Sequence, residues 1–169
     1  SRVINISADD LGVEARTCLP EWFYTKLAEQ FGQDRAESFS QAVLSAAPLD
    51  LRVNTVKAST VDLLAALTNM GIQVNPIEGL PEGLRAVGKP IVGKTEVFQE
   101  GYFEVQDAGS QWVSRLVAPR RGDLVIDFCA GAGGKTLAIG AQMKNTGRIV
   151  ALDTSEPTQF EHYAMPRAR

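Results

Sequence analysis

The sequence predicts an α/β protein in two parts, a small α+β module followed by the first β-α-β of a nucleotide-type fold. Residues 50–92 have the pattern order β-α-β-β, with turn residues between short apolar runs. Residues 124–153 hold two apolar runs that end in Asp127 and Asp153, with a glycine-dense turn and an apolar helical segment between them. Only 16 residues follow Asp153, so we expect the second fold to be incomplete.

We expect an N-terminal helical segment over residues 1–47. Pro20 opens a helical pattern that includes Phe23, and Gly32 is a stop signal for that helix. A second helix is expected over 34–46. We expect Trp22 and Phe23 to be core residues rather than ligand-binding residues.

The second predicted segment, 48–94, is the small α+β module. Residues 51–56 alternate like a half-buried strand. Ser59 and Asp62 have capping-box spacing, and Gly71 ends the helix that they begin. A strand at 72–74 and short strands between turns complete the module.

The third predicted segment, 95–169, begins with two strands joined at Glu100-Gly101. Asp107 then caps a helix that ends before Pro119. The strands at 124–128 and 149–152 are apolar throughout, which is typical of a parallel sheet covered on both faces.

The spacing of the glycines limits which class of ligand the glycine turn can bind. A phosphate-binding P-loop would need glycine where Cys129 stands. The dinucleotide fingerprint would need glycine where Thr136 stands. What remains is Asp127-x-x-x-Gly131-x-Gly133, which resembles the first motif of S-adenosylmethionine-dependent methyltransferases.

Asp153 lies 20 residues after Gly133, the spacing of an acid that binds ribose hydroxyls. Glycine lets the backbone approach a ligand, and the N–H groups at the start of the next helix carry partial positive charge. A tight turn without a ligand stays open as an alternative. The expected cofactor-binding residues are Cys129, Ala130, Gly131, Ala132, Gly133, Gly134, Lys135 and Asp153.

Composition limits the remaining classes. No apolar run reaches the roughly 18 residues that span a bilayer. Two cysteines and one histidine give neither a disulfide framework nor a metal site, and a cytoplasmic location is expected. The net charge of -3 argues weakly against a nucleic-acid partner. Local basic residues could still supply a positively charged patch, although ordinary solvated surface is the simpler interpretation of each. These residues are Arg115, Arg120, Arg121, Lys89 and Lys94.

Three motifs together resemble one family. They are Leu51-Arg52-Val53-Asn54, then Gly101-Tyr102-Phe103-Glu104-Val105-Gln106-Asp107-Ala108-Gly109-Ser110-Gln111, then Asp127-Phe128-Cys129-Ala130-Gly131-Ala132-Gly133-Gly134-Lys135-Thr136. Over residues 20–156 the chain resembles the Nol/Nop/Sun family of RNA cytosine-5 methyltransferases, most closely the bacterial branch that modifies 16S ribosomal RNA. Many members have proline where Ala132 stands, and residues 157–166 do not resemble the family's continuation.

The resemblance implies an RRM- or ferredoxin-like RNA-facing module, a Rossmann-like methyltransferase domain that is truncated, S-adenosyl-L-methionine as cofactor and ribosomal RNA as partner. It also implies that a cysteine thiolate adds to cytosine C6. The family's cysteine motifs lie beyond the second strand, so no catalytic residue is expected in this chain. We expect Cys18 to be structural or incidental, the Cys129 thiol to be buried, and His162 to have no role.

The resulting prediction is a fragment of an RNA methyltransferase, inactive by itself. The alternatives are a non-catalytic RNA-binding or interaction protein derived from such an enzyme, and a truncated product without a function. Because apolar strands would lack partners, we also expect self-association.

Overall fold

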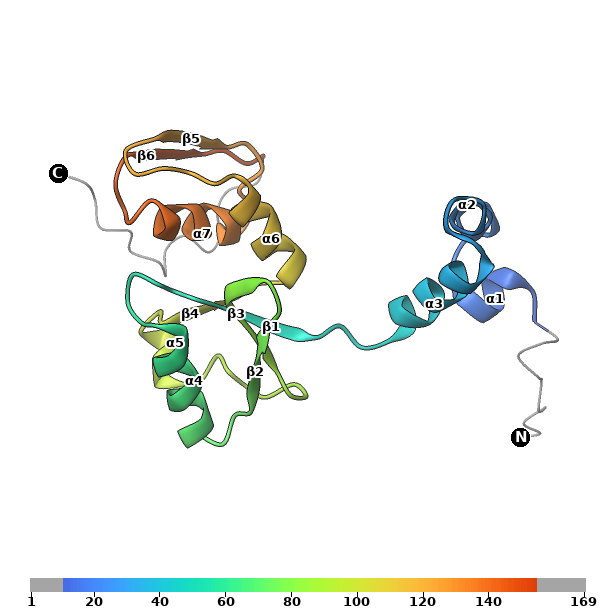
Figure 1. The fold of residues 1–169 in the computed structure, drawn as a ribbon, viewed down its shortest axis with the longest axis horizontal. Helices are drawn as coiled ribbons and strands as arrows, with labels where there is room; N and C mark the ends of the chain where they lie inside the picture. Colours follow the sequence, from blue (N-terminus) through green and yellow to red (C-terminus); the bar gives the residue numbers. More distant parts are fainter. Residues whose placement is uncertain (1–10, 155–169) are drawn as a thin grey trace. The chain divides into compact units, whose positions relative to one another are not determined.

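The computed structural model describes residues 11–154, and the chain divides into two compact units, Ser1–Ala47 and Pro48–Arg169 (Figure 1). The described part of the first unit contains three helices, α1 (Val13–Thr17), α2 (Glu21–Phe31) and α3 (Gln33–Leu44). Gly32 has a φ of 88° and separates α2 from α3. The predicted helices are therefore present, with the predicted stop.

The aromatic residues of the first unit are less buried than expected. Trp22 keeps 64% of its surface exposed, so its assignment to the core is wrong. Phe23 is half-buried, and the centroid of its ring lies 5.5 Å from that of Trp22 and 6.2 Å from that of Phe39. Three short helices offer too little surface to enclose side chains of this size.

The second unit begins with a four-stranded antiparallel sheet. Its elements in chain order are β1 (Leu49–Val53), α4 (Thr60–Asn69), β2 (Val74–Ile77), β3 (Leu80–Ala86), α5 (Glu96–Gln99) and β4 (Phe103–Val105). The strand order is β2-β3-β1-β4, and each neighbouring pair is antiparallel. A β-α-β-β-α-β chain with this order is a ferredoxin-like fold, which agrees with the predicted module.

One face of this sheet holds the hydrophobic core. Leu51 and Val53 of β1 pack with Leu63 and Leu67 of α4 and with Phe103 of β4. Helix α4 begins at the predicted cap, where the Asp62 N–H donates to Ser59 Oγ over 3.1 Å. Alternation on the strands and a capped amphipathic helix together account for this layer.

The region after residue 94 differs from the prediction. Residues Glu96–Gln99 form helix α5 instead of a strand, because Thr95 caps it by accepting from the Phe98 N–H. Strand β4 follows and pairs with β1. The four-stranded sheet thus continues past the expected end of the module at residue 94; the domain limits themselves stay a prediction.

Helix α6 (Ala108–Leu116) covers the other face of the sheet, and the predicted cap Asp107 accepts from the Ser110 N–H. Asp50 Oδ2 of β1 accepts from the Ala108 N–H over 3.1 Å. Gln111 lies close to β3, because a Cβ on Gly83 of that strand would be 3.1 Å from Gln111 Oε1. This polar face of β1 is therefore an interior surface.

The chain then forms β5 (Leu124–Asp127), α7 (Gly134–Gln142) and β6 (Arg148–Ala151). Strands β5 and β6 pair in parallel, as predicted for a β-α-β unit. Helices α6 and α7 lie side by side between the two sheets (Figure 1). Leu124 and Ile126 are exposed, which agrees with the expectation that these apolar strands lack covering partners within the described residues.

Candidate cofactor-binding site

The glycine turn connects the end of β5 to the start of α7, and the ends of both parallel strands hold it. The Leu152 N–H donates to the Asp127 carbonyl over 2.8 Å. The Ala130 N–H donates to the Leu152 carbonyl over 3.0 Å. Ligand sites of open α/β sheets form at this carboxyl edge of the strands.

Asp153 and the glycine turn meet at this edge. Asp153 Oδ2 accepts from the Gly131 N–H over 2.7 Å. Two features that lie 22 residues apart in the sequence are thus in direct contact. A carboxylate has further lone pairs, so Asp153 can accept from ligand hydroxyls while it holds the turn.

The turn has the backbone of a ligand cradle. Gly131 has a φ of 53° and Gly133 a φ of 85°, both in the region that favours glycine. A Cβ on Gly131 would meet nothing within 4 Å, so the space beside this glycine is open. Gly133 is also the N-cap of α7 and supplies no side chain to cap the helix. The N–H groups from Gly134 onward therefore begin an α-helix whose start attracts an anionic group.

A partly buried hydrogen bond supports the glycine turn. Thr136 is fully buried, and its Oγ1 donates to Asp127 Oδ2 over 2.6 Å. This contact joins the end of β5 to the first turn of α7. In the sequence, Thr136 excluded a dinucleotide pattern, and its bond to Asp127 was not predicted. The spacing of Asp127 and Thr136 across a strand-turn-helix is the signal that indicates this pair.

The two cysteines lie in different settings. Cys129 is exposed, which corrects the expectation of a buried thiol, and its neighbour Ala130 is the buried residue of the turn. Cys18 is exposed at the C-cap of α1 with a φ of 54°. Both thiols are free. His162 lies outside the described residues.

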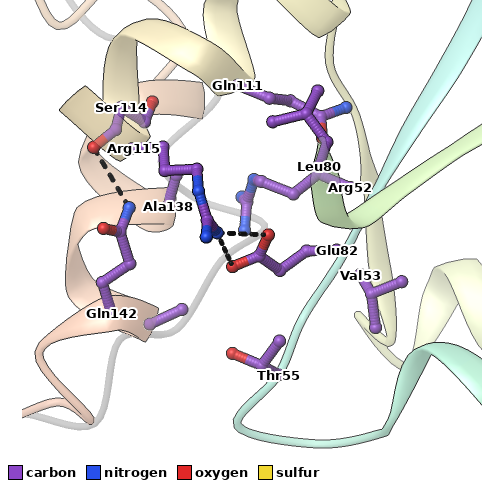
Figure 2. Close-up of a pocket in the computed structure, with 11 residues that line it drawn as sticks. Arg52, Val53, Thr55, Leu80, Glu82, Gln111, Ser114, Arg115, Ala138 and Gln142 are labelled. Carbon is purple, nitrogen blue, oxygen red and sulfur yellow. Dashed lines mark hydrogen bonds and ion pairs between the residues drawn. The ribbon is translucent and has the colours of Figure 1, made fainter. Parts of the chain in front are cut away.

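A small cavity lies between the four-stranded sheet and helices α6 and α7 (Figure 2). Its volume is about 20 Å³, which is room for one water. Arg52 and the ion pair between Arg115 and Glu82 line it, with 3.3 Å between Nη1 and Oε2. Pairing with Glu82 reduces what Arg115 can contribute to a basic patch.

Neither metal-binding nor membrane-spanning features occur within residues 11–154. No three acidic, histidine or cysteine residues of this range gather at a possible metal site. None of its helices has the length and apolar character needed to cross a membrane.

Comparisons with known proteins agree with this geometry. Residues 19–91 match the family described as "Methyltr_RsmF/B-like, ferredoxin-like domain". Residues 114–160 match "16S rRNA methyltransferase RsmB/F". The chain belongs to the RsmB/F methyltransferase family. The second match includes the whole glycine turn and Asp153.

Curated relatives of the family are named as ribosomal RNA methyltransferases. The probable ribosomal RNA small subunit methyltransferase B of Synechocystis is 34% identical over 79% of this chain. The Bacillus subtilis protein of the same name is 34% identical over 81%. A mouse 28S rRNA (cytosine-C(5))-methyltransferase is 31% identical over 80%. The aligned region covers 30%, 30% and 17% of these relatives, so the chain spans less than a third of their length.

Solved structures support the fold. A methyltransferase homologue from Pyrococcus horikoshii superposes with a TM-score of 0.76 at 29% identity, over 84% of this chain and 47% of that protein. NSun6 from the same organism superposes with a TM-score of 0.73 at 19% identity, over 81% and 59%. The second likeness is evidence of the fold alone.

Proposed function

We propose that the glycine turn and Asp153 form one side of an S-adenosyl-L-methionine site. The contact between the Gly131 N–H and Asp153 Oδ2 is the main support, because it joins the cradle and the ribose-binding acid at one edge of the sheet. In this proposal the residues from Cys129 to Lys135 surround the amino-acid part of the cofactor. Asp153 accepts hydrogen bonds from the ribose hydroxyls. The cofactor supplies an electrophilic methyl group.

We further propose that the chain is part of an RNA cytosine-5 methyltransferase that acts on ribosomal RNA in the cytoplasm. In such a reaction a thiolate adds to cytosine C6, and C5 then attacks the methyl group. Cys129 lies in the cofactor turn and Cys18 ends a helix of the other unit, so we assign neither thiol this attack. The chain alone is therefore expected not to methylate RNA.

An RNA contact in this proposal uses surfaces other than the middle of the four-stranded sheet. One face of that sheet packs against α4 and α5, and α6 covers the other. RRM domains bind RNA on an open sheet face. This chain therefore needs the sheet rim, the helices or further polypeptide for RNA.

The cofactor site is tested by NMR titration of the isotope-labelled chain with S-adenosylhomocysteine. We expect weak binding, because a pocket normally encloses most of its ligand and the described residues supply one wall. Shifts should centre on residues 129–135, and Asp153→Asn should reduce them. Asp34→Asn, an exposed residue of α3, is the charge-matched control. Shifts spread over the surface, or an unaffected Asp153→Asn variant, would contradict this site. Submicromolar binding would mean that another segment or chain completes it.

A further inference from the structure

Gln106 joins the four-stranded sheet to the start of α7. It follows β4, and only 7% of its surface is exposed. Its backbone N–H donates to the Asp50 carbonyl over 3.0 Å, and its carbonyl accepts from Gln111 Nε2 over 2.8 Å. These two bonds fix the backbone from which the side chain extends.

Arg52 determines how the side-chain amide of Gln106 is turned. The Arg52 Nε–H donates to Gln106 Oε1 over 2.6 Å. A guanidinium has only donors, so the amide oxygen must face it and the amide nitrogen must point away. Arg52 is itself 5% exposed on the polar face of β1. Burial lowers the pKa of its guanidinium, and the carboxylates of Glu104 and Glu82 act in the opposite direction.

The amide nitrogen of Gln106 points toward the glycine turn. Gln106 Nε2 lies 3.4 Å from the position that a Cβ on Gly134 would take, beside the first residue of α7. Within residues 11–154 this buried nitrogen has no hydrogen-bond acceptor, and neither has Arg52 Nη2. Arg52 also lines the cavity, where a water can accept its hydrogen bond (Figure 2). Gln106 does not line that cavity.

A buried donor beside a helix start without a side-chain cap calls for an acceptor from outside the described residues. Native proteins rarely leave such a donor unpaired. The start of α7 attracts an anionic group, and the amide adds a directed donor to the helix N–H groups. Among the parts of the proposed cofactor, only the carboxylate of its amino-acid moiety is an anion.

We propose that Gln106, oriented by Arg52, donates through Nε2 to the carboxylate of the amino-acid moiety of the cofactor at the start of α7. This inference rests on the proposed cofactor site. Gln106 is thereby a specificity residue that distinguishes ligands with an amino-acid tail from ligands without one. It also makes the sheet of the ferredoxin-like module part of the cofactor site.

The test compares two ligands on the full chain by NMR titration into the millimolar range. S-adenosylhomocysteine carries the amino-acid tail, and 5′-methylthioadenosine lacks it. Gln106→Glu keeps an oxygen for Arg52 but replaces the donor with a negatively charged acceptor. We expect its affinity for S-adenosylhomocysteine to fall about tenfold or more and its affinity for methylthioadenosine to stay within about twofold. Gln73→Glu, at an exposed position of the same unit, is the matched control and should leave both affinities unchanged.

The other outcomes separate this inference from the proposed site. Unchanged binding of both ligands to Gln106→Glu, in a folded variant, overturns the inference and leaves the site standing. Equal loss of both ligands means that Gln106 supports the shape of the turn, which also overturns it. If the unaltered chain binds neither ligand at millimolar concentration, the proposed site and the inference both fail.

Discussion

The two sheets of the second unit bury their apolar side chains to opposite extents. Leu51 in the four-stranded sheet is fully buried, whereas Ile126 in the two-stranded sheet keeps 61% of its surface exposed. Strand β1 has α4 and α5 on one face and α6 on the other. On the two-stranded sheet, α7 packs where a Cβ on Gly140 would be 3.6 Å from Ile149. Burial thus depends on what covers each face, and we infer that the four-stranded sheet holds most of the stability.

The largest expected effect is the loss of a core side chain from β1. Leu51→Ala should lower the free energy of unfolding by about 3 kcal/mol, because it removes buried methyl groups and leaves a cavity. Ile126→Ala should change it by less than about 0.5 kcal/mol, since its side chain is largely in solvent. Urea unfolding of the two variants measures both values. Similar losses would show that the two sheets share the stability equally.

A second change should disturb the two-stranded sheet alone. Gly147 precedes β6 with a φ of 83°, and a Cβ there would be 2.4 Å from the Asp123 carbonyl oxygen. Gly147→Ala should therefore cost about 2 kcal/mol locally and increase amide exchange in β5 and β6. Exchange in β1 should not change. Gly71→Ala introduces a positive-φ alanine without a close contact and should leave β5 and β6 as they are.

A third change tests the polar face of β1. The side-chain hydrogen bonds from Arg85, at 2.7 and 2.9 Å, hold the pKa of Asp50 below its ordinary value of 3.8, and the Ala108 N–H acts in the same direction. Asp50→Asn should cost about 2 kcal/mol at neutral pH, because a buried acceptor of charged and backbone donors is lost.

The pH dependence of the Asp50 contribution has a definite sign. Its folded-state pKa is depressed, so the stabilisation is present above the ordinary value of 3.8 and is lost as the pH falls through the folded-state pKa. The difference between wild type and Asp50→Asn should therefore shrink in acid. Glu78→Gln, an exposed residue between β2 and β3, should show no such difference. A gap that is constant from pH 7 to about pH 2 would refute this assignment.

The exposed face of β5 is expected to cause self-association. Ile126→Lys should lower the average mass in light scattering toward that of the monomer, because a charge on an apolar strand opposes edge and face contacts. Val61→Lys, on the exposed side of α4, should leave the mass unchanged. An unaltered chain that is already monomeric at high concentration would remove the basis for this expectation.

Features fixed by neighbouring residues could be predicted from the sequence, and features fixed by distant ones could not. The caps at Ser59 and Asp107 act over three residues, and both were predicted. The Arg52 contact with Gln106 joins residues 54 positions apart, and no local pattern indicates it. The alternation of polar and apolar residues in β1 predicts a strand with one buried face, yet α6 buries the polar face as well.

The candidate site follows the same division. The meeting of Gly131 and Asp153 follows from parallel pairing, because both lie at the carboxyl ends of neighbouring strands. The exposure of Cys129 did not follow, since its side-chain direction depends on how the turn bends after β5.

Amide hydrogen exchange across the second unit tests the central claim most directly. Amides of β1 and β3 should exchange only through global unfolding, with protection that falls in parallel with stability as urea is added. Amides of β5 and β6 should exchange through local opening, with much lower protection that barely depends on dilute urea. Equal protection of the two sheets, with the same dependence on urea, would contradict the claim that the four-stranded sheet holds most of the stability.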